Sequence, residues 1–267
     1  MFTTEFRDYV HHRVLELARA DLRVTGGALT GSTALGAGDK WSDVDVAFGI
    51  ADGYRLETVL NDWTRTLDQE FSVVNHFDLR AGKRIFRVFL LPNGLEIDIS
   101  VMPAEEFGAY GPEFRVLFGT SCQVAAMPQP DASSLIGLGW LHVLHARASI
   151  ERNKPWKAEY WISGVRDQVI ALACLRVGEN AIYGRGVDRL PAAVIDPLVG
   201  ALVRSLDAKE LRRALAVATL CLIAELEEWD KQLSVRLSPL LREFGTSQAE
   251  EEQVSAVEPL AEKEEES

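Results

Sequence analysis

The segment from residue 29 to residue 48 constrains this chain more than any other part of its sequence. It is typical of a strand that enters a Gly31-Ser32 turn, passes through a short glycine-punctuated stretch, and continues as a second strand carrying Asp43 and Asp45. Residues two apart on a strand point to the same face, so both carboxylates are expected at one spot. Like charges held so close are costly unless a cation lies between them. Oxygen ligands of this kind suit Mg²⁺ or Mn²⁺.

A third carboxylate has a candidate in the stretch 94–101, where polar and apolar residues alternate. The alternation predicts a strand that places Asp98 on its polar face. Glu96 lies on the same face and is the alternative to Asp98. A solvated strand face with no chemical role is the alternative for both. The residues expected on the buried face of this strand are Leu95, Ile97 and Ile99.

The rest of the first hundred residues mixes helix and strand patterns. The Asn-Gly pair at 93–94 is the strongest short hairpin signal. It would return the chain so that Asp98 runs antiparallel to the preceding strand and lies beside the strand of the two aspartates. Apolar spacing predicts helices at 4–20 and 54–68, and strands at 24–30, 43–49, 71–78 and 84–91.

This order of elements, Gly-Ser, then Asp-x-Asp, then a later single carboxylate, resembles the nucleotidyltransferase superfamily related to DNA polymerase β. The resemblance covers roughly residues 24–101, and the combination carries it, since each element alone is common on ordinary turns and strands. The bacterial enzymes that modify aminoglycoside and lincosamide antibiotics are the nearest members. The resemblance implies an α/β nucleotidyltransferase core, a mixed sheet with helices, followed here by an all-α helical domain.

The resemblance also assigns roles to residues. Asp43 and Asp45 would hold Mg²⁺ or Mn²⁺, and Asp98 would either complete the metal site or take the proton from an acceptor hydroxyl. Gly31 and Ser32 would lie against the triphosphate of ATP or another nucleoside triphosphate, because glycine removes the side-chain barrier to a close approach and a hydroxyl can bind anionic oxygens. The sequence leaves both roles of Asp98 open.

The second half of the chain differs from the first in its composition and in its predicted secondary structure. Residues 103–130 contain four prolines and are expected to form a connector with short helices. Strand patterns end there, and helical patterns follow at about 133–151, 156–177, 192–204, 207–230 and 231–244. We therefore expect a catalytic domain at 1–125, a helical substrate- and nucleotide-binding domain at 126–244, and a disordered acidic tail at 245–267.

Charge and aromatic side chains are concentrated near residues 151–161, at a junction between two predicted helices. This segment resembles the second domain of the antibiotic nucleotidyltransferases less specifically than the first half does. A solvated helix face with its tryptophans in the core explains the same pattern equally well. The candidates for triphosphate binding are Lys154, Lys157 and Arg166, and those for acceptor binding are Glu159, Tyr160 and Trp156.

The net charge of the chain also helps to distinguish between classes of acceptor. The formal net charge is −12, and the segment 245–267 contains eight glutamates and one lysine. The remainder is mildly acidic and has no dense basic stripe of the kind that neutralises nucleic-acid phosphates. Polynucleotide acceptors are therefore disfavoured, and a small cationic acceptor such as an aminoglycoside is favoured.

No apolar run reaches the roughly 18 residues that would span a bilayer, and the amino terminus lacks a secretory pattern. Three scattered cysteines form no disulfide framework. These features predict a cytoplasmic protein with no membrane association. Nothing in the sequence indicates its oligomeric state.

The resemblance to the nucleotidyltransferases implies a magnesium-dependent enzyme of antibiotic-resistance type. It would move a nucleoside monophosphate, AMP from ATP, to a hydroxyl of a small molecule and release pyrophosphate. One alternative keeps the site and makes oligo- or cyclic nucleotides as signals. The other is a non-catalytic binding protein with the nucleotidyltransferase fold, and the retained carboxylates argue against it.

Overall fold

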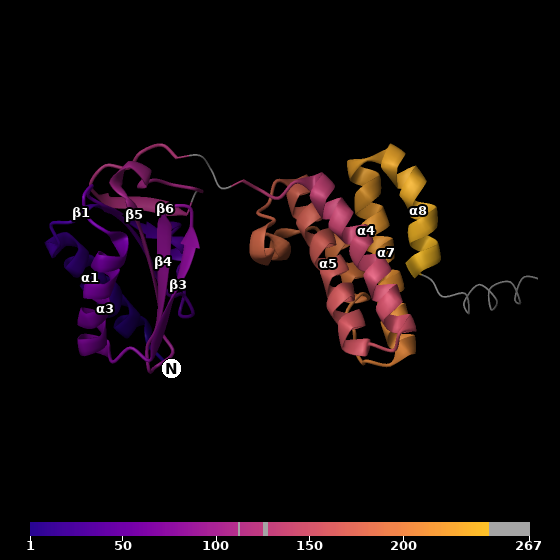
Figure 1. The fold of residues 1–267 in the computed structure, drawn as a ribbon, viewed down its shortest axis with the longest axis horizontal. Coiled ribbons are helices and arrows are strands. Elements are labelled where there is room, and N and C mark those ends of the chain that lie inside the picture. Colours follow the sequence, from indigo (N-terminus) through magenta and orange to yellow (C-terminus); the bar gives the residue numbers. More distant parts are fainter. Residues whose placement is uncertain (112, 125–127, 246–267) are drawn as a thin grey trace, which may run out of the picture. The chain divides into compact units, whose positions relative to one another are not determined.

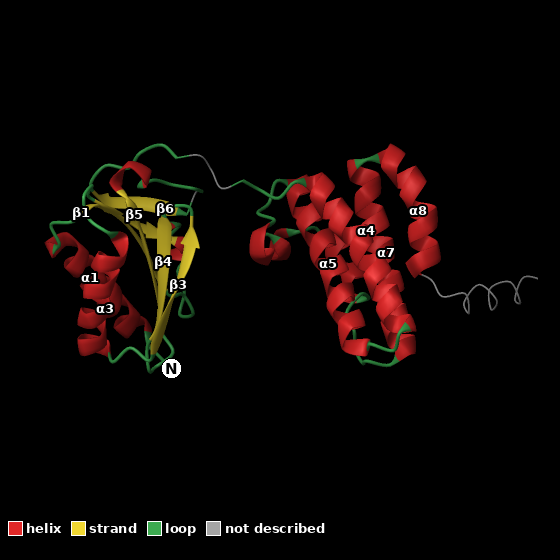
Figure 2. Cartoon of the chain, viewed as in Figure 1, coloured by secondary structure: helices red, strands yellow, loops and turns green. Residues whose placement is uncertain are grey.

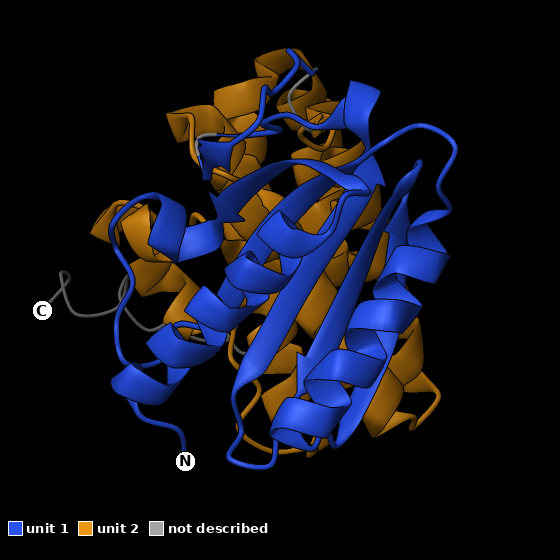
Figure 3. Cartoon of the chain, turned by 90° about the vertical axis from the view of Figure 1, so that its left-hand side faces the viewer, with its two compact units in different colours: residues 1–127 blue, residues 128–267 orange. Residues whose placement is uncertain are grey.

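The computed structural model describes residues 1–111, 113–124 and 128–245. The chain divides into two compact units, Met1–Met127 and Pro128–Ser267 (Figure 3), which are described separately below. Within the described ranges, no helix is both long enough and apolar enough to cross a membrane.

The first unit is built on a mixed six-stranded sheet in the order β3-β4-β5-β2-β1-β6 (Figure 1). Its β2 and β5 run parallel to each other, and the other neighbouring strands are antiparallel. Helices α1 (Thr4–Ala20) and α3 (Leu56–Phe71) cover one face of the sheet. The strands are β1 (Val24–Thr30), β2 (Val44–Ile50), β3 (Asn75–Ala81), β4 (Arg84–Leu90), β5 (Glu96–Pro103) and β6 (Phe114–Phe118).

The main core of this unit lies between the sheet and the two helices. Alternate residues of each strand face the helices, so the period-two pattern of the sequence becomes one buried layer. The residues expected on the buried side of β5, Ile97 and Ile99, and Leu95 just before it, are fully buried there. Helix α1 begins after Thr3, whose hydroxyl accepts a hydrogen bond from the backbone N–H of Phe6.

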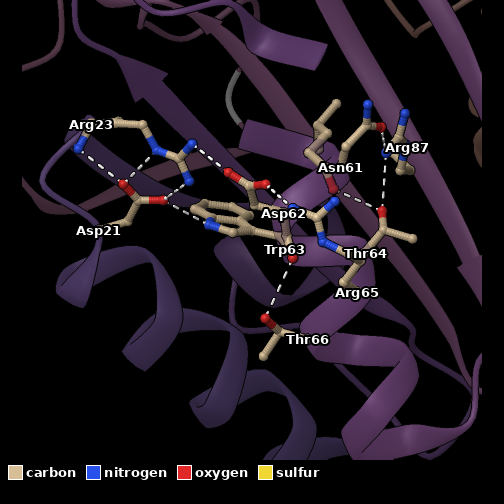
Figure 4. A network of polar contacts seen from close by, with 10 residues as sticks. Asp21, Arg23, Asn61, Asp62, Trp63, Thr64, Arg65, Thr66 and Arg87 are labelled. Atoms are coloured by element: carbon tan, nitrogen blue, oxygen red, sulfur yellow. Dashed lines mark hydrogen bonds and ion pairs between the residues drawn. The ribbon is translucent and has the colours of Figure 1, made fainter. Parts of the chain in front are cut away.

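A polar network fastens α3 to the strands beneath it (Figure 4). Asp21 accepts two hydrogen bonds from the guanidinium of Arg23 and one from the indole N–H of Trp63, at 2.9 Å. Arg23 also reaches Asp62 of α3 at 2.6 Å. Because these groups pair with one another, the helix can bury its apolar side without leaving an isolated charge.

Arg87 of β4 makes the second half of this attachment. Its guanidinium donates to Asn61 and Thr64 of α3, both at 2.9 Å (Figure 4). It also forms a two-pronged ion pair with Asp78 of β3, at 2.6 and 2.9 Å. Arg87 is only 5% exposed, so its charge depends on these partners, which join β3, β4 and α3.

Within the described residues of the first unit, no long helix packs on the opposite face of the sheet. The chain after β5 makes a short 3₁₀ turn, Ala104–Glu106, and packs Phe107 against β1 and β2. A side chain at Gly26 or Gly49 would clash with the Phe107 ring, so these glycines let the ring lie flat on the sheet. Phe107 covers one end of this open face, together with Ala28, Ala47, Met102 and Phe114.

The second unit is helical throughout its described part (Figure 2). Its largest contacts join α4 to α5, α5 to α7, and α7 to α8. Arg176 of α5 forms a two-pronged ion pair with the buried Glu225 of α7, at 2.7 and 2.9 Å. The helices are α4 (Ala132–Glu151), α5 (Pro155–Val177), α6 (Ala192–Val199), α7 (Ala208–Trp229) and α8 (Lys231–Gly245), with 3₁₀ turns at Ile182–Gly184 and Val187–Arg189.

The expected fold class, a mixed sheet with helices followed by an all-α region, is confirmed. Two details of the first unit were predicted wrongly. The strand expected at 71–78 starts only at Asn75, because α3 continues to Phe71 and Ser72 closes it with a φ of 54°. The expected connector contains β6, which pairs with β1. The acidic tail predicted at 245–267 lies outside the described residues, apart from Gly245 at the end of α8.

Candidate active site

The carboxylates singled out in the sequence meet on the open face of the sheet. Asp45 of β2 and Asp98 of β5 are direct partners in the parallel register. Val44 and Val46 point into the core beneath the helices, so Asp45 points the other way, as does Asp43 just before the strand. Glu96 begins β5 on the same face as Asp98. The hairpin expected at 93–94 places β5 as predicted, antiparallel to β4 and beside β2.

Their surroundings hold these carboxylates closer to neutrality than usual. Burial raises the pKa of Asp45 to about 8, reinforced by the charge of Asp43, a hydrogen bond with Asp43, and the charges of Asp98 and Glu96. Burial also raises the pKa of Asp98 to about 6, with further contributions from Glu96 and Asp43. Burial and then Asp43 raise the pKa of Glu96. These raised pKa values show that several negative charges placed together with little solvent around them are unfavourable.

The cluster has no cation of its own within the described part of the first unit. No lysine, arginine or histidine of that unit forms an ion pair with Asp43, Asp45, Glu96 or Asp98. The Oδ1 atom of Asp98 is buried and has no hydrogen-bond partner among the described residues. A buried acceptor left without a partner is costly, so this oxygen is available to a ligand.

This oxygen-only set fits a hard divalent cation such as Mg²⁺ or Mn²⁺. Among the described residues, no three His, Cys, Asp or Glu side chains already converge in metal-binding geometry. The aspartates are thus neighbours on adjacent strands rather than an assembled coordination shell.

The Gly-Ser turn lies directly against this cluster. Gly31 has a φ of +62°, and a Cβ built on it would come 2.1 Å from Oδ2 of Asp45. Only glycine meets both conditions, the left-handed backbone and the close approach to the carboxylate. Gly31 begins the short helix α2 (Gly31–Ala34), and the turn leads straight into Ser32.

The hydroxyl of Ser32 is held by the loop before β2. It donates to Oγ of Ser42 at 3.1 Å, and that oxygen also accepts the backbone N–H of Asp39 at 2.8 Å. Ser42 and Asp39 were not singled out in the sequence. An aspartate followed three residues later by a serine is a common local turn pattern, and it was the available signal for this support.

Five of the six candidate residues of the helical region lie at the start of α5, and Arg166 lies at the middle of that helix. Lys154 caps the helix, and Trp156 and Tyr160 are 75% and 66% exposed. Lys157 is exposed as well. Glu159 accepts a hydrogen bond from the Ser163 hydroxyl at 2.7 Å, and Arg166 lies 3.9 Å from Asp167. The structure thus brings Gly31, Ser32, Asp43, Asp45 and Asp98 together in the first unit, and these six residues on α5 of the second.

Comparison with known proteins gives limited additional information. No protein-family model matches the chain, and no curated protein does. Among solved structures, the chain is similar to the crystal structure of an aminoglycoside 6-adenyltransferase from Bacillus subtilis. The match has 13% identity and a TM-score of 0.40, and it covers 88% of this chain and 96% of that one. At this distance we base the candidate site on its own residues.

Proposed function

We propose that the protein is a nucleotidyltransferase that moves AMP from ATP to a hydroxyl group of a small molecule. The observation that carries this proposal is the pairing of Asp45 with Asp98 on adjacent parallel strands, with Gly31 pressed against the Asp45 carboxylate. Two buried carboxylates beside a glycine turn suit a cation and a phosphate chain at the same place.

In the proposed reaction the acceptor hydroxyl oxygen attacks the α-phosphorus of ATP. A new phosphorus–oxygen bond forms, the bond from the α-phosphorus to the bridging oxygen breaks, and pyrophosphate leaves with its electron pair. A divalent cation bound here would neutralise charge on the attacking and leaving oxygens. Asp43 and Asp45 are the residues we expect to hold it.

Asp98 has two possible roles in this scheme, and its environment suits both. As a metal ligand it would offer Oδ1, the oxygen that has no hydrogen-bond partner among the described residues. As a general base it would accept the hydroxyl proton, and a pKa of about 6 brings it nearer to neutral pH, where a base works best. Glu96 lies close enough to take the second role if Asp98 takes the first.

We expect Gly31 and Ser32 to contact the triphosphate, because the turn lies against the carboxylates. On α5, Lys154, Lys157 and Arg166 are our candidates for further triphosphate contacts. Trp156, Tyr160 and Glu159 are candidates for holding the acceptor, since two exposed aromatic rings and a carboxylate can bind a ring-bearing cation. The reaction consumes ATP, so we expect it to take place in the cytoplasm.

The acceptor class that we favour is the small cationic alcohols, of which the aminoglycosides are one group. The carboxyl groups clustered around Asp45 and Asp98 support this choice, because an ammonium group close to the reacting hydroxyl would favour their ionised forms and be attracted to them. A polynucleotide is disfavoured for the same reason.

The test is pyrophosphate release by the full chain with ATP and Mg²⁺, in the presence of kanamycin, of lincomycin, or of no acceptor. Asp45→Asn should reduce the rate by at least about a thousandfold, as expected for loss of a group that stabilises the transition state. Asp52→Asn is the matched control, because Asp52 is an exposed carboxylate in the loop after β2. Mass spectrometry should show the acceptor carrying AMP.

Each contrary outcome has a definite meaning. Undiminished turnover in Asp45→Asn contradicts the assignment of the site. Products that contain only nucleotides, formed without an added acceptor, point to the signalling synthase. Absence of both turnover and magnesium-dependent ATP binding in the unsubstituted protein supports a non-catalytic role.

A further inference from the structure

We propose that the open face of β3 and β4 binds the apolar part of the acceptor, so that the acceptor is an amphipathic amino alcohol rather than a fully polar one. This inference rests on the proposed function, because it places the acceptor's hydroxyl at the carboxylates. We call the surface the β3–β4 platform, and it consists of Phe77, Leu79, Phe86, Val88 and Leu90.

The strand registers connect this platform directly to the carboxylates. Asp98 of β5 pairs with Asp45 on one side and with Val88 on the other, and Val88 pairs in turn with Phe77 of β3. Directly paired residues share a face of the sheet. One continuous row therefore crosses four strands, acidic in its first half and apolar in its second.

A parallel row supports the same division. Ser100 of β5 pairs with Phe86, which pairs with Leu79. Glu96 pairs with Leu90 at the end of β4. Since Arg87 faces α3, its neighbours Phe86 and Val88 face the open side. Strands lie about 4.8 Å apart, so Phe77 stands about 10 Å from Asp98, the length of a small molecule with one or two rings.

The platform is unusually exposed for its composition. Phe77, Leu79 and Leu90 are 52%, 55% and 46% exposed, and β3 is the edge strand of the described sheet. Edge strands are commonly protected by charged side chains, yet here the open face of β3 carries a phenylalanine and a leucine. Contiguous exposed apolar surface of this kind marks binding sites.

The same open face shows what a covered apolar surface looks like in this protein. At the other end, Met102 and Ala47 are fully buried under Phe107. Within the described residues of the first unit, the chain provides such an aromatic cover for one end and none for the platform, where the Arg84 guanidinium lies over the Phe86 ring at 5.8 Å from its centre.

The occupant must match both halves of the row. Carboxylates at Asp45, Glu96 and Asp98 favour an amine and a hydroxyl at one end of the ligand. The platform favours an apolar chain or ring at the other end, since each methylene removed from water contributes about fourfold in affinity. A fully polar polyol would leave the apolar side chains of the platform exposed to water. A fully apolar molecule would have no hydroxyl group to react. An amphipathic amino alcohol fulfils both conditions.

The experiment uses two probes that differ only in their apolar part, 2-(methylamino)ethanol and 2-(octylamino)ethanol. Calorimetry measures their binding to the full chain in the presence of Mg²⁺ and α,β-methylene-ATP. In the unsubstituted protein we expect the octyl probe to bind at least about a hundredfold more tightly, consistent with several buried methylenes. In the double variant Phe77→Ser/Leu79→Ser this preference should fall below about tenfold.

Two controls separate the platform from other effects. Val116→Ser alters an apolar residue on the opposite edge strand, β6, and should keep the octyl preference; Val116 is 40% exposed. Asp45→Asn should weaken both probes equally and leave their ratio unchanged. Circular dichroism melts of Phe77→Ser/Leu79→Ser and of Val116→Ser should coincide with that of the unsubstituted protein, because the residues substituted in these two variants are exposed.

Three outcomes would overturn the inference. They are no chain-length preference in the unsubstituted protein, an unchanged preference in the double variant, and a loss of ATP-analogue affinity with the preference intact. The last would mean that the nucleotide base, not the acceptor, covers the platform. If the preference behaves as expected but no pyrophosphate is ever released, the proposed function fails while the binding surface stands.

Discussion

The two faces of the sheet differ in whether their charged side chains are paired. On the helix-covered face, the buried guanidinium of Arg87 meets the carboxylate of Asp78 and two further oxygens on α3. On the open face, Asp45 and Asp98 lie side by side with an unpartnered oxygen, and no cation in the described part of that unit forms an ion pair with either of them. The paired Arg87 lies on β4 and the unpaired Asp98 lies on β5, so neighbouring strands carry the two kinds of charged group.

The charges on the helix-covered face stabilise the fold, whereas the carboxylates on the open face are available to a ligand. Paired charges on the helix side are compensated within the chain and need nothing from outside. Clustered carboxylates on the open side raise the free energy of the folded chain, and a bound cation would remove that cost. The open face is therefore the place where stability and ligand binding should be coupled, and the helix side is the place where they should not.

The largest effect on stability should come from breaking the compensated face. Asp78→Ala leaves Arg87 buried without its counter-charge, which typically costs about 3 to 5 kcal/mol. Urea unfolding measures the loss. Asp68→Ala, an exposed carboxylate at the end of α3, is the matched control and should change the free energy of unfolding by less than about 0.5 kcal/mol. Equal effects of the two substitutions would contradict the comparison.

A second test uses pH on the metal-free protein. The pKa values of Asp45 and Asp98, about 8 and about 6, lie above their ordinary value of 3.8, so the folded state holds protons that the unfolded state has lost. Stability should therefore fall as pH rises from about 4 to about 8. Asp78 has the opposite sign, because Arg87 lowers its pKa, and its contribution is lost on acidification below about 4.

Adding Mg²⁺ makes the measurement of stability against pH more specific for the carboxylate cluster. Adding Mg²⁺ should raise the unfolding temperature more at pH 8 than at pH 5, since the ion competes with protons for the same oxygens. Asp45→Asn should remove most of the difference. Thermal melts with Mg²⁺ or with EDTA at each pH give the result. A magnesium effect that is the same at both pH values, or the same in Asp45→Asn, would speak against a cation site on the open face.

The smallest stability effect should come from a pair of glycines in the loop beside the site. Gly31 and Gly36 both have positive φ, of 62° and 71°, but only Gly31 has Asp45 where a Cβ would stand. Each change to alanine should cost about 1 to 2 kcal/mol for the left-handed backbone, and Gly31→Ala must in addition displace the Asp45 carboxylate. Gly31→Ala should also lower pyrophosphate release at least tenfold, while Gly36→Ala keeps it. Equal rates in the two variants would show that the contact with Asp45 is unimportant.

Much of the first unit could be predicted because its signals are local. Alternation placed Asp98 and its buried neighbours correctly, and the Asn-Gly pair identified the turn between β4 and β5. The β6 strand could not be found this way, because it is short and its partner β1 is far away in the sequence. Nor could the contact between Gly31 and Asp45, which exists only once the sheet has formed.

The aromatic residues near the start of α5 show another limit. In the sequence, Trp156, Tyr160 and Trp161 look alike as stacking candidates. In the structure Trp161 packs against the rings of His142 and His145, at 4.9 and 4.8 Å between centroids, while Trp156 stands exposed. Which side of the helix faces α4 decides this, and helix packing is a tertiary property that the local pattern leaves open.

The parallel register between β2 and β5 has a consequence for how the protein folds. β3, β4 and β5 follow one another along the chain and can pair as local hairpins, whereas β2 must wait for β5 across the whole of α3, β3 and β4. Such long loop closures are slow steps in folding. Asp45 and Asp98 therefore become neighbours only when β2 joins β5, so the appearance of their shared site during refolding reports the time at which these two strands pair.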